Sequence, residues 1–503
     1  MRWVALWLAV AAMYVLTSSG RIASTDGLSM YAVSRSIVTH GNFSTDPCVP
    51  ETRGNDCVPG VDGHNYAGYG LATSILMVPP YVAGVALARA MHRDERFMTG
   101  LTVVLWHGVL SALVSVLLAL WLCQIGISWT ASATAALILA FATPLWYHAT
   151  KAFCSEPNFS IGLLGCCYLL ARADRPALLL GAGACLGFAF ACRVYGLVLG
   201  PAILIYALLT WKSRGATAKR TMTNLLWFGS SAGVFVALIA WSNMARFGSV
   251  FKTGYHLQFQ SVTELFANPI LRGMRDLLFN GEVGLLIFVP WLIALPFLWR
   301  FIWRQHRREA ILVLGIVFTN YAFFAKYAGW RGGLSFGPRL LLPTIPFLVA
   351  PLAVLFDQKP ELRKTMLWRA TVALIVCSFA IALATSPYPF ARYYNLRREA
   401  REQGRGQELW VGKPLLKVAV DVPKLFLPPG GDPADDRDRQ YLMSFENGVN
   451  LVKPDFWILK AALLGISKVL LGILVFGLLS AFGWGLWRVY TPAAPKPLSG
   501  QIS

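Results

Sequence analysis

The chain has 503 residues, of which 56% are hydrophobic and 14% are charged, a balance that excludes an ordinary soluble globular protein. Apolar runs near ~20 residues, long enough to cross a bilayer, recur along nearly the whole length. The net charge of +20 arises from basic residues in short loops between these runs, which is typical of cytoplasmic loops and not of a nucleic-acid-binding surface. We therefore expect an all-α polytopic membrane protein.

The first apolar run, at about residues 3–20, is expected to be an uncleaved first span, because no clear cleavage site follows it and further spans do. A long outer loop, about 21–98, comes next and carries Asp26 within "TDGLSMYAVSRSIVTHGNF". This stretch predicts a short amphipathic helix with Asp26 near its N-terminal end, where backbone N–H groups favour a negative charge. The carboxylate is therefore either a solvated boundary residue or a general base for a hydroxyl group.

Two of the nine cysteines, Cys48 and Cys57, flank the polar segment "VPETRGND" in this loop. A disulfide between them is expected if the loop is extracytoplasmic. The other seven cysteines lie in or beside apolar runs and are expected to pack as small hydrophobic side chains.

The segment 71–91 is apolar and about long enough to span the bilayer, but Pro79 and Pro80 interrupt it. If it spans, the loop that carries Asp26 lies in the cytoplasm. If it lies in the outer interface or re-enters, Asp26 shares the outer face with Glu156. We favour the second arrangement, although it places the basic stretch "RAMHRDERF" outside.

Basic loops set the rest of the topology, because positively charged loops stay in the cytoplasm. We take 172–175, 212–220, 300–309 and 357–369 as cytoplasmic. About twelve spans result, at about 3–20, 100–123, 128–147, 159–171, 177–192, 196–211, 223–243, 282–299, 310–326, 341–356, 370–386 and 458–487. The predicted division is a transmembrane catalytic module at 1–386, an extracytoplasmic loop or cap at 387–457, and a last transmembrane helix with a cytoplasmic tail at 458–503.

Glu156, in "HATKAFCSEPNFS", begins a later span, with Pro157 as a helix-start residue. It either complements the helix dipole or acts as a second acid that faces the same outer cavity as Asp26. Two such acids can divide the work between a base and a hydroxyl anchor, or they can hold a divalent cation. Because two oxygen ligands are weak evidence for a metal, we predict no metal site and no cofactor.

Outward Lys and Arg residues run against the positive-inside bias, and either an anionic ligand or lipid headgroups would explain them. Arginine suits phosphate because its planar group binds two oxygens. The segments "RFGSVFKTGY" (246–255) and "WRGGLSFGPR" (330–339) interleave cations, glycines and aromatic rings. The candidates for phosphate binding are Arg193, Lys252, Arg331 and Arg339, and those for other substrate contacts are His148, Lys151, Tyr255 and Trp330.

The sequence lacks the motifs of several common classes of enzymes and nucleotide-binding proteins. It contains no Walker A loop, G-x-S-x-G, H-E-x-x-H or dinucleotide-binding glycine motif. Ionisable residues are scarce inside the predicted spans, which argues against an ion-coupled pump.

The acid after the first span, the acid that opens a later span and the two outer aromatic–glycine–basic segments together resemble the polytopic GT-C superfamily of glycosyltransferases. That group includes protein O-mannosyltransferases and the aminoarabinose transferases of lipid A. The resemblance implies a polyprenyl-phosphate sugar donor and Asp26 as catalytic base. We expect Arg193, Arg331 or Arg339 to bind the donor phosphate, with Lys252 as a further candidate, and in-line displacement would invert the sugar. It implies a lipid, glycan or protein acceptor at the outer face of a bacterial inner membrane. The sequence departs from many members in having Gly27 after Asp26 and Glu at position 156.

Two other classes share the spans and the outer cations. A lipid-linked glycan transporter or flippase would perform no transfer and would leave Asp26 as a boundary residue. A ligase or polymerase of lipid-diphosphate glycans would use the arginine-rich stretch "RREAREQGRGQE" (397–408).

Overall fold

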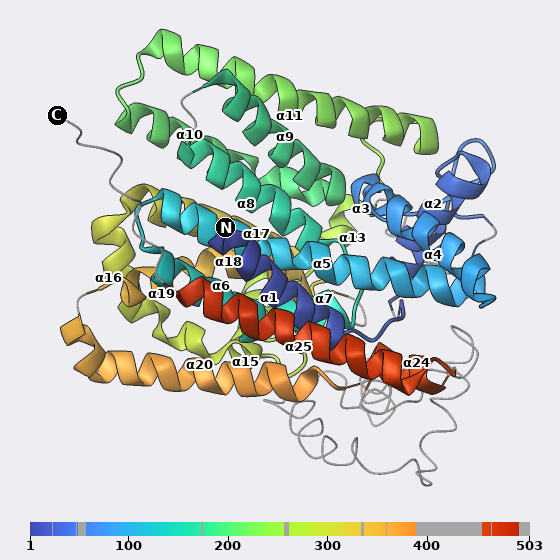
Figure 1. Ribbon diagram of the computed structural model, residues 1–503. Helices are drawn as coiled ribbons and strands as arrows, with labels where there is room; N and C mark the ends of the chain where they lie inside the picture. Colours follow the sequence, from blue (N-terminus) through green and yellow to red (C-terminus); the bar gives the residue numbers. More distant parts are fainter. Residues whose placement is uncertain are drawn as a thin grey trace, which may run out of the picture.

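The computed structural model describes residues 1–22, 24–46, 48, 57–172, 175–255, 261–332, 337–358, 360–388, 455–463 and 465–491. Helices build most of this part of the chain (Figure 1). Most of the predicted loop or cap at 387–457, including the arginine-rich stretch 397–408, lies outside the described residues.

The helices of the first half begin with α1 (Arg2–Thr17), α2 (Thr25–His40), α3 (Leu71–Leu76), α4 (Val78–Met91), α5 (Glu95–Gln124), α6 (Trp129–Phe141) and α7 (Leu145–Thr150). They continue with α8 (Glu156–Arg172), α9 (Pro176–Cys192), η2 (Val194–Leu199), α10 (Gly200–Ser213) and α11 (Ala218–Phe247).

The second half contains α13 (Val262–Leu265), α14 (Ile270–Phe279), α15 (Leu285–Phe288), η3 (Pro290–Ala294), α16 (Leu295–Gln305), α17 (Arg307–Lys326) and η4 (Arg339–Thr344). It ends with α18 (Ile345–Leu348), α19 (Ala350–Phe356), η5 (Pro360–Lys364), α20 (Met366–Thr385), α24 (Trp457–Leu463) and α25 (Lys468–Tyr490). The strands β1 (Val58–Pro59) and β2 (Asn65–Tyr66) pair antiparallel, with Val58 opposite Tyr66.

Several helices of the bundle turn apolar side chains outward. In α11, α20 and α25 at most 11% of the most apolar stretch is buried by the rest of the chain. Trp241 of α11 and Phe476 of α25 are among the exposed large side chains. Backbone groups of a helix are satisfied within the helix, so such surfaces are stable in hydrocarbon. The chain is an integral membrane protein.

Eight helices of the described residues are long and apolar enough to cross a bilayer, and three shorter apolar helices accompany them. The predicted count of about twelve stays a prediction. Proline accounts for much of the difference, because it ends or interrupts helices. The run expected at 282–299 is divided into α15, η3 and α16, with Pro290 and Pro296 each near the start of a new helix. The run expected at 128–147 breaks at Pro144 between α6 and α7.

Helices α1 and α5 lie antiparallel. Leu6 near the start of α1 belongs to the same buried cluster as Val116, whereas Gly20, just after α1, lies against Leu101 near the start of α5. The end of α1 and the beginning of α5 are therefore at the same end of the bundle, which we call the site end. Figure 1 shows α2, α3 and α4 gathered at this end.

The segment 71–91 connects two points at the site end. Gly70 packs so tightly on the end of α9 that an added Cβ would lie 2.1 Å from the carbonyl oxygen of Ala191. Fourteen residues of it form α4, which packs on the first turns of α5, where the Thr102 hydroxyl donates to the carbonyl of Pro80 (2.7 Å). By length and composition alone Leu71–Met91 is one of the eight candidate spans. Its attachment at both ends fits the interpretation that it does not carry the chain to the opposite face.

Two loops at the site end run side by side and position the residues described next. They follow α1 and α7. The amide of Ser19 donates to the carbonyl of Thr150 (2.9 Å), and the hydroxyl of Ser24 donates to the carbonyl of Phe153 (2.7 Å). We call them the paired loops, 18–22 with Ser24 and 150–155.

Candidate active site

Asp26 lies in the first turn of α2, directly after the first of the paired loops. Ser24 caps this helix, since its hydroxyl accepts from the amide of Gly27 (3.1 Å). A Cβ on Gly27 would lie 2.9 Å from the carbonyl oxygen of Phe153. The position after Asp26 therefore has no room for a side chain, because the helix starts against the other loop.

Glu156 is the first residue of α8 and follows the second paired loop. Its side chain is fully buried. The carboxylate oxygen Oε1 accepts from Nη2 of Arg193 (2.6 Å) and from Nε of Arg339 (2.8 Å). Two guanidinium groups therefore converge on one buried carboxylate, which compensates the loss of hydration of all three groups.

Arg339 joins the two acids. Its Nη2 atom donates to Oδ2 of Asp26 and lies 3.4 Å from Oε2 of Glu156. Arg193 also reaches toward both, with Nη2 3.7 Å from Oδ2 of Asp26. The four side chains hold two positive and two negative charges, so the cluster is neutral overall.

The two acids differ in access. The side chain of Asp26 is 16% exposed, whereas that of Glu156 is 0% exposed. Only Asp26 can meet a substrate directly in this arrangement. Glu156 can act only through the arginines that it holds.

Tyrosine side chains surround Arg193. Its Nη1 atom donates to the hydroxyl of Tyr255, and its guanidinium lies over the ring of Tyr69, 5.3 Å from the centroid. Burial raises the pKa of Tyr255 above its ordinary value. The phenol therefore keeps its proton at neutral pH and has it available for donation to an anion.

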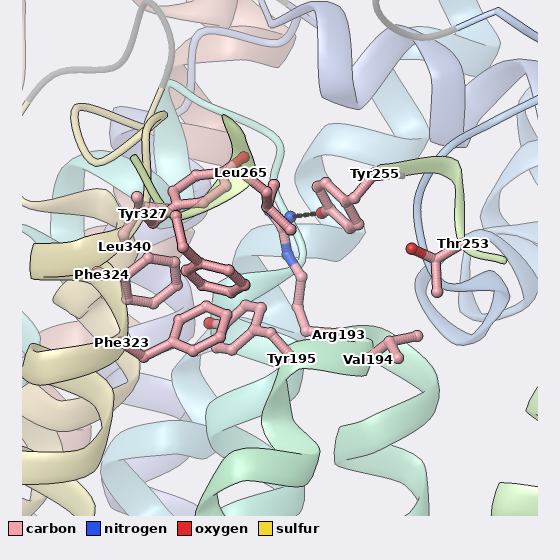
Figure 2. Close-up of a pocket in the computed structure, with 11 residues that line it drawn as sticks. Arg193, Val194, Tyr195, Thr253, Tyr255, Leu265, Phe323, Phe324, Tyr327 and Leu340 are labelled. Atoms are coloured by element: carbon pink, nitrogen blue, oxygen red, sulfur yellow. Dashed lines mark hydrogen bonds between the residues drawn. The ribbon is translucent and has the colours of Figure 1, made fainter. Parts of the chain in front are cut away.

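An open cavity adjoins Arg193 (Figure 2). Most of its wall is aromatic. The rings of Tyr195 and Phe323 stack with centroids 5.9 Å apart, and Phe324 meets Tyr195 edge-on at 4.9 Å. Figure 2 shows Arg193 and Tyr255 hydrogen-bonded to each other beside these aromatic side chains. The lining residues are Arg193, Val194, Tyr195, Thr253, Tyr255, Leu265, Phe266, Phe323, Phe324, Tyr327 and Leu340.

The structure separates some of the remaining sequence candidates from this cluster. Lys252 is exposed. Arg331 is half-buried and lies over the ring of the buried Trp330, 5.2 Å from its centroid. His148, in contrast, is close enough to Glu156 to interact with its charge. It is fully buried, and its carbonyl accepts from Nε2 of His107 (3.2 Å). Lys151 is also buried, but it contacts Asp455 and not the two acids.

The predicted pair Cys48 and Cys57 is joined by a disulfide in the outer loop. Within the ranges described, no group of three or more His, Cys, Asp or Glu side chains is arranged to hold a metal ion.

Several residues of the site escaped the sequence analysis. The aromatic residues that line the cavity include Tyr195, Phe323, Phe324 and Tyr327. Each lies in or beside an apolar run, where an aromatic residue is expected to pack in the hydrophobic core. Arg21, Asp455 and Lys460, which contact one another or Lys151, were also not singled out. Their only sequence signal is charge at the edge of an apolar run.

Comparisons with known proteins find similarity in structure only. No protein-family model matches this chain, and no curated protein matches it in sequence. Two solved structures are similar to it: the crystal structures of ArnT from Cupriavidus metallidurans, one bound to undecaprenyl phosphate and one in the apo state. Each is 14% identical, with 97% of this chain and 76% of the ArnT chain covered, and the TM-scores are 0.45 and 0.44.

Proposed function

We propose that this protein is an integral membrane glycosyltransferase that moves a sugar from a polyprenyl-phosphate donor to a hydroxyl group of an acceptor, with Asp26 as general base. The observation that carries the proposal is the cluster of Asp26, Glu156, Arg193 and Arg339 at one end of the bundle, beside an aromatic cavity. The cluster offers a reachable base and two oxyanion-binding groups within contact distance of each other.

Arg193 and Arg339 are suited to the donor phosphate. A guanidinium binds two phosphate oxygens at once. Both arginines are held by Glu156 before any ligand arrives, so little reorganisation is needed when charge grows on the leaving phosphate. Preorganised donors of this kind contribute several kcal/mol, and the loss of one lowers the rate roughly 10²–10³-fold. The neutral hydroxyl of Tyr255 is a further hydrogen-bond donor for the donor phosphate.

The aromatic cavity supplies the apolar part of the donor site. Flat rings such as those of Tyr195, Phe323 and Phe324 suit either a sugar face or the first units of a prenyl chain. Arg193 lies at its edge, so a phosphate on this arginine would place its substituents against the rings.

Asp26 is assigned the proton transfer. It takes the proton of the acceptor hydroxyl while the acceptor oxygen attacks the anomeric carbon and the bond from that carbon to the phosphate oxygen breaks. In-line attack inverts the anomeric centre. The released electron pair stays on the phosphate, next to Arg193 and Arg339. Binding of the phosphate to Arg339 also competes with the ion pair to Asp26, which frees the carboxylate to act as a base.

Glu156 is assigned a positioning role. It was expected from sequence to be catalytic, but its side chain has no exposed surface. Lys252 and Arg331 remain candidates for outer contacts to the donor headgroup.

The test is sugar transfer by the purified full-length protein in lipid nanodiscs, with polyprenyl-phosphate sugars as donors. Asp26→Asn should lower transfer by about 10²–10⁴-fold, the usual contribution of a general base. Asp62→Asn is the matched control, because Asp62 is an exposed acid of the same outer loop. Transfer by Asp26→Asn at the rate of the control would remove Asp26 as base. Absence of transfer by the wild-type protein would favour a transporter.

A further inference from the structure

A second cluster of buried charges lies at the site end, apart from the cluster around Glu156. It consists of Arg21, Lys151, Asp455 and Lys460, which we call the Arg21 cluster. Each of these side chains is nearly or fully buried. Lys460 pairs with Oδ1 of Asp455 (2.8 Å) and donates to the carbonyl of Ser19 (2.7 Å). Lys151 donates to the main-chain carbonyl of Asp455.

The Arg21 cluster carries more positive than negative charge. It contains three cations and one carboxylate, whereas the cluster around Glu156 contains two of each. Buried charges without a counter-charge are strongly unfavourable. Burial lowers the pKa of Lys151 to about 7 against the opposing effect of Asp455, and Lys460 and Arg21 lower it further. Although burial alone would raise the pKa of Asp455, the neighbouring cations lower it to about 2. Counted over these four side chains of the described part of the chain, a positive excess therefore remains at neutral pH.

Arg21 has unused hydrogen-bond donors. Its Nε and Nη2 atoms are buried and have no hydrogen-bond acceptor among the described residues. The distance from Nη2 to Oδ2 of Asp455 is 3.7 Å, which is too long for a hydrogen bond. A buried guanidinium normally has its donors satisfied. An oxyanion would satisfy both free donors and the excess charge at once.

The paired loops connect the two clusters. Arg21 precedes Asp26 by five residues, and Lys151 precedes Glu156 by five residues. Five residues of fully extended chain span at most about 18 Å. The Arg21 cluster is thus close enough to Asp26 for one molecule to reach both.

We propose that Arg21, Lys151 and Lys460 form a second anion-binding site, which takes a phosphate or another oxyanion group of the acceptor. A polyprenyl-phosphate donor carries its single phosphate on the reacting carbon, so that phosphate belongs beside Asp26. An anion held by Arg21 must therefore come from the other substrate. The assignment to the acceptor rests on the proposed function, whereas the binding of an anion does not.

Sulfate is the probe, because its charge does not change between pH 6 and 8. The full-length protein is placed in phosphatidylcholine nanodiscs, and its unfolding midpoint is measured in sodium sulfate and in sodium chloride of equal ionic strength. Sulfate should raise the midpoint of the wild type by several degrees more than chloride does. Arg21→Gln should lose this difference, Arg21→Lys should keep part of it, and the exposed control Lys219→Gln should keep all of it.

A second variant guards against misfolding of Arg21→Gln. Asp455→Asn removes the carboxylate that competes with an incoming anion, so its sulfate-dependent shift should be larger than that of the wild type. Equal midpoints in sulfate and chloride for the wild type would overturn the proposal, and so would an unchanged shift in Arg21→Gln. An unchanged shift in Asp455→Asn would show that the cluster is compensated within the chain, which also overturns it.

Two further arms identify the source of the anion. Phosphatidic acid in the nanodisc tests a lipid headgroup, and glucose 6-phosphate in solution tests a soluble glycan phosphate. A shift with either supports the site and names its source, and a shift with neither contradicts a phosphate ligand. Asp26→Asn should keep the sulfate shift. The two proposals can therefore fail separately. The sulfate shift tests the anion-binding site, and sugar transfer by Asp26→Asn tests the proposed function.

Discussion

Asp26 and Glu156 are bridged by a single guanidinium group, that of Arg339. The two acids are far apart in the chain and are brought together because the loops that precede them run side by side. Their shared partner places a partly exposed carboxylate and a fully buried one on the same cation, and this difference in access divides their roles.

Removal of the buried charge of Glu156 should damage both stability and transfer. Glu156→Gln leaves two buried guanidinium groups with only Asp26 as a counter-charge, and breaking a buried ion pair in this way costs roughly 3–5 kcal/mol. Glu156→Asp keeps the charge and should restore part of the stability and part of the transfer. Unfolding in denaturant and transfer by the folded fraction check this. A variant Glu156→Gln with wild-type stability and transfer would contradict the positioning role.

Replacement of Arg339 by lysine should weaken donor handling while the charge is kept. Lysine is a point charge and cannot bind two oxygens in a fixed plane. We expect Arg339→Lys to lower kcat/KM for the donor by roughly 10²-fold. Arg300→Lys serves as the control, because Arg300 is exposed and lies over the ring of Phe301. Equal effects of the two substitutions would argue that Arg339 has no special position.

The aromatic wall should determine donor affinity more than rate. Phe323→Ala removes the ring that stacks on Tyr195, and the KM for the donor should rise about 10-fold or more, since a buried aromatic contact is worth one to a few kcal/mol. Phe297→Ala is the matched control, because Phe297 is 63% exposed on α16. A KM that is unchanged in Phe323→Ala would place the donor elsewhere.

The Arg21 cluster should make stability depend on pH. The pKa of Lys151 is about 7 in the folded protein and about 10.4 in an unfolded chain. Between these values the unfolded state binds more protons, so stability rises with pH by on the order of 1 kcal/mol per unit from pH 7 to 10. The charged groups that face Lys151 are Asp455, Lys460 and Arg21. Lys151→Met should flatten the measured profile, whereas an identical profile would show that Lys151 does not titrate in this range.

The sequence located the main parts of the candidate site but not its contacts. Asp26, Glu156, Arg193 and Arg339 could be chosen because each is a charged residue at the edge of an apolar run, where composition changes abruptly. Lys151 could be chosen by the same rule, but its partner Asp455 lies 304 positions away. No local periodicity or spacing reports such a contact, which depends on how α1, α7 and α24 meet.

The helix breaks at proline residues were also not predicted from the sequence. Apolar composition predicted continuous spans at 128–147 and 282–299, and hydrophobicity alone does not show where a helix is interrupted. The breaks at Pro144, Pro290 and Pro296 follow from the missing N–H group and the fixed φ of proline.

The central claim is that the carboxylate of Asp26 takes the acceptor proton during sugar transfer. Single-turnover kinetics test it most directly, because protein loaded with donor reports the chemical step apart from binding. Asp26→Asn should retain bound donor and should transfer the sugar at least 100-fold more slowly than the wild type. A transfer rate in the loaded variant equal to that of the wild type would contradict the account.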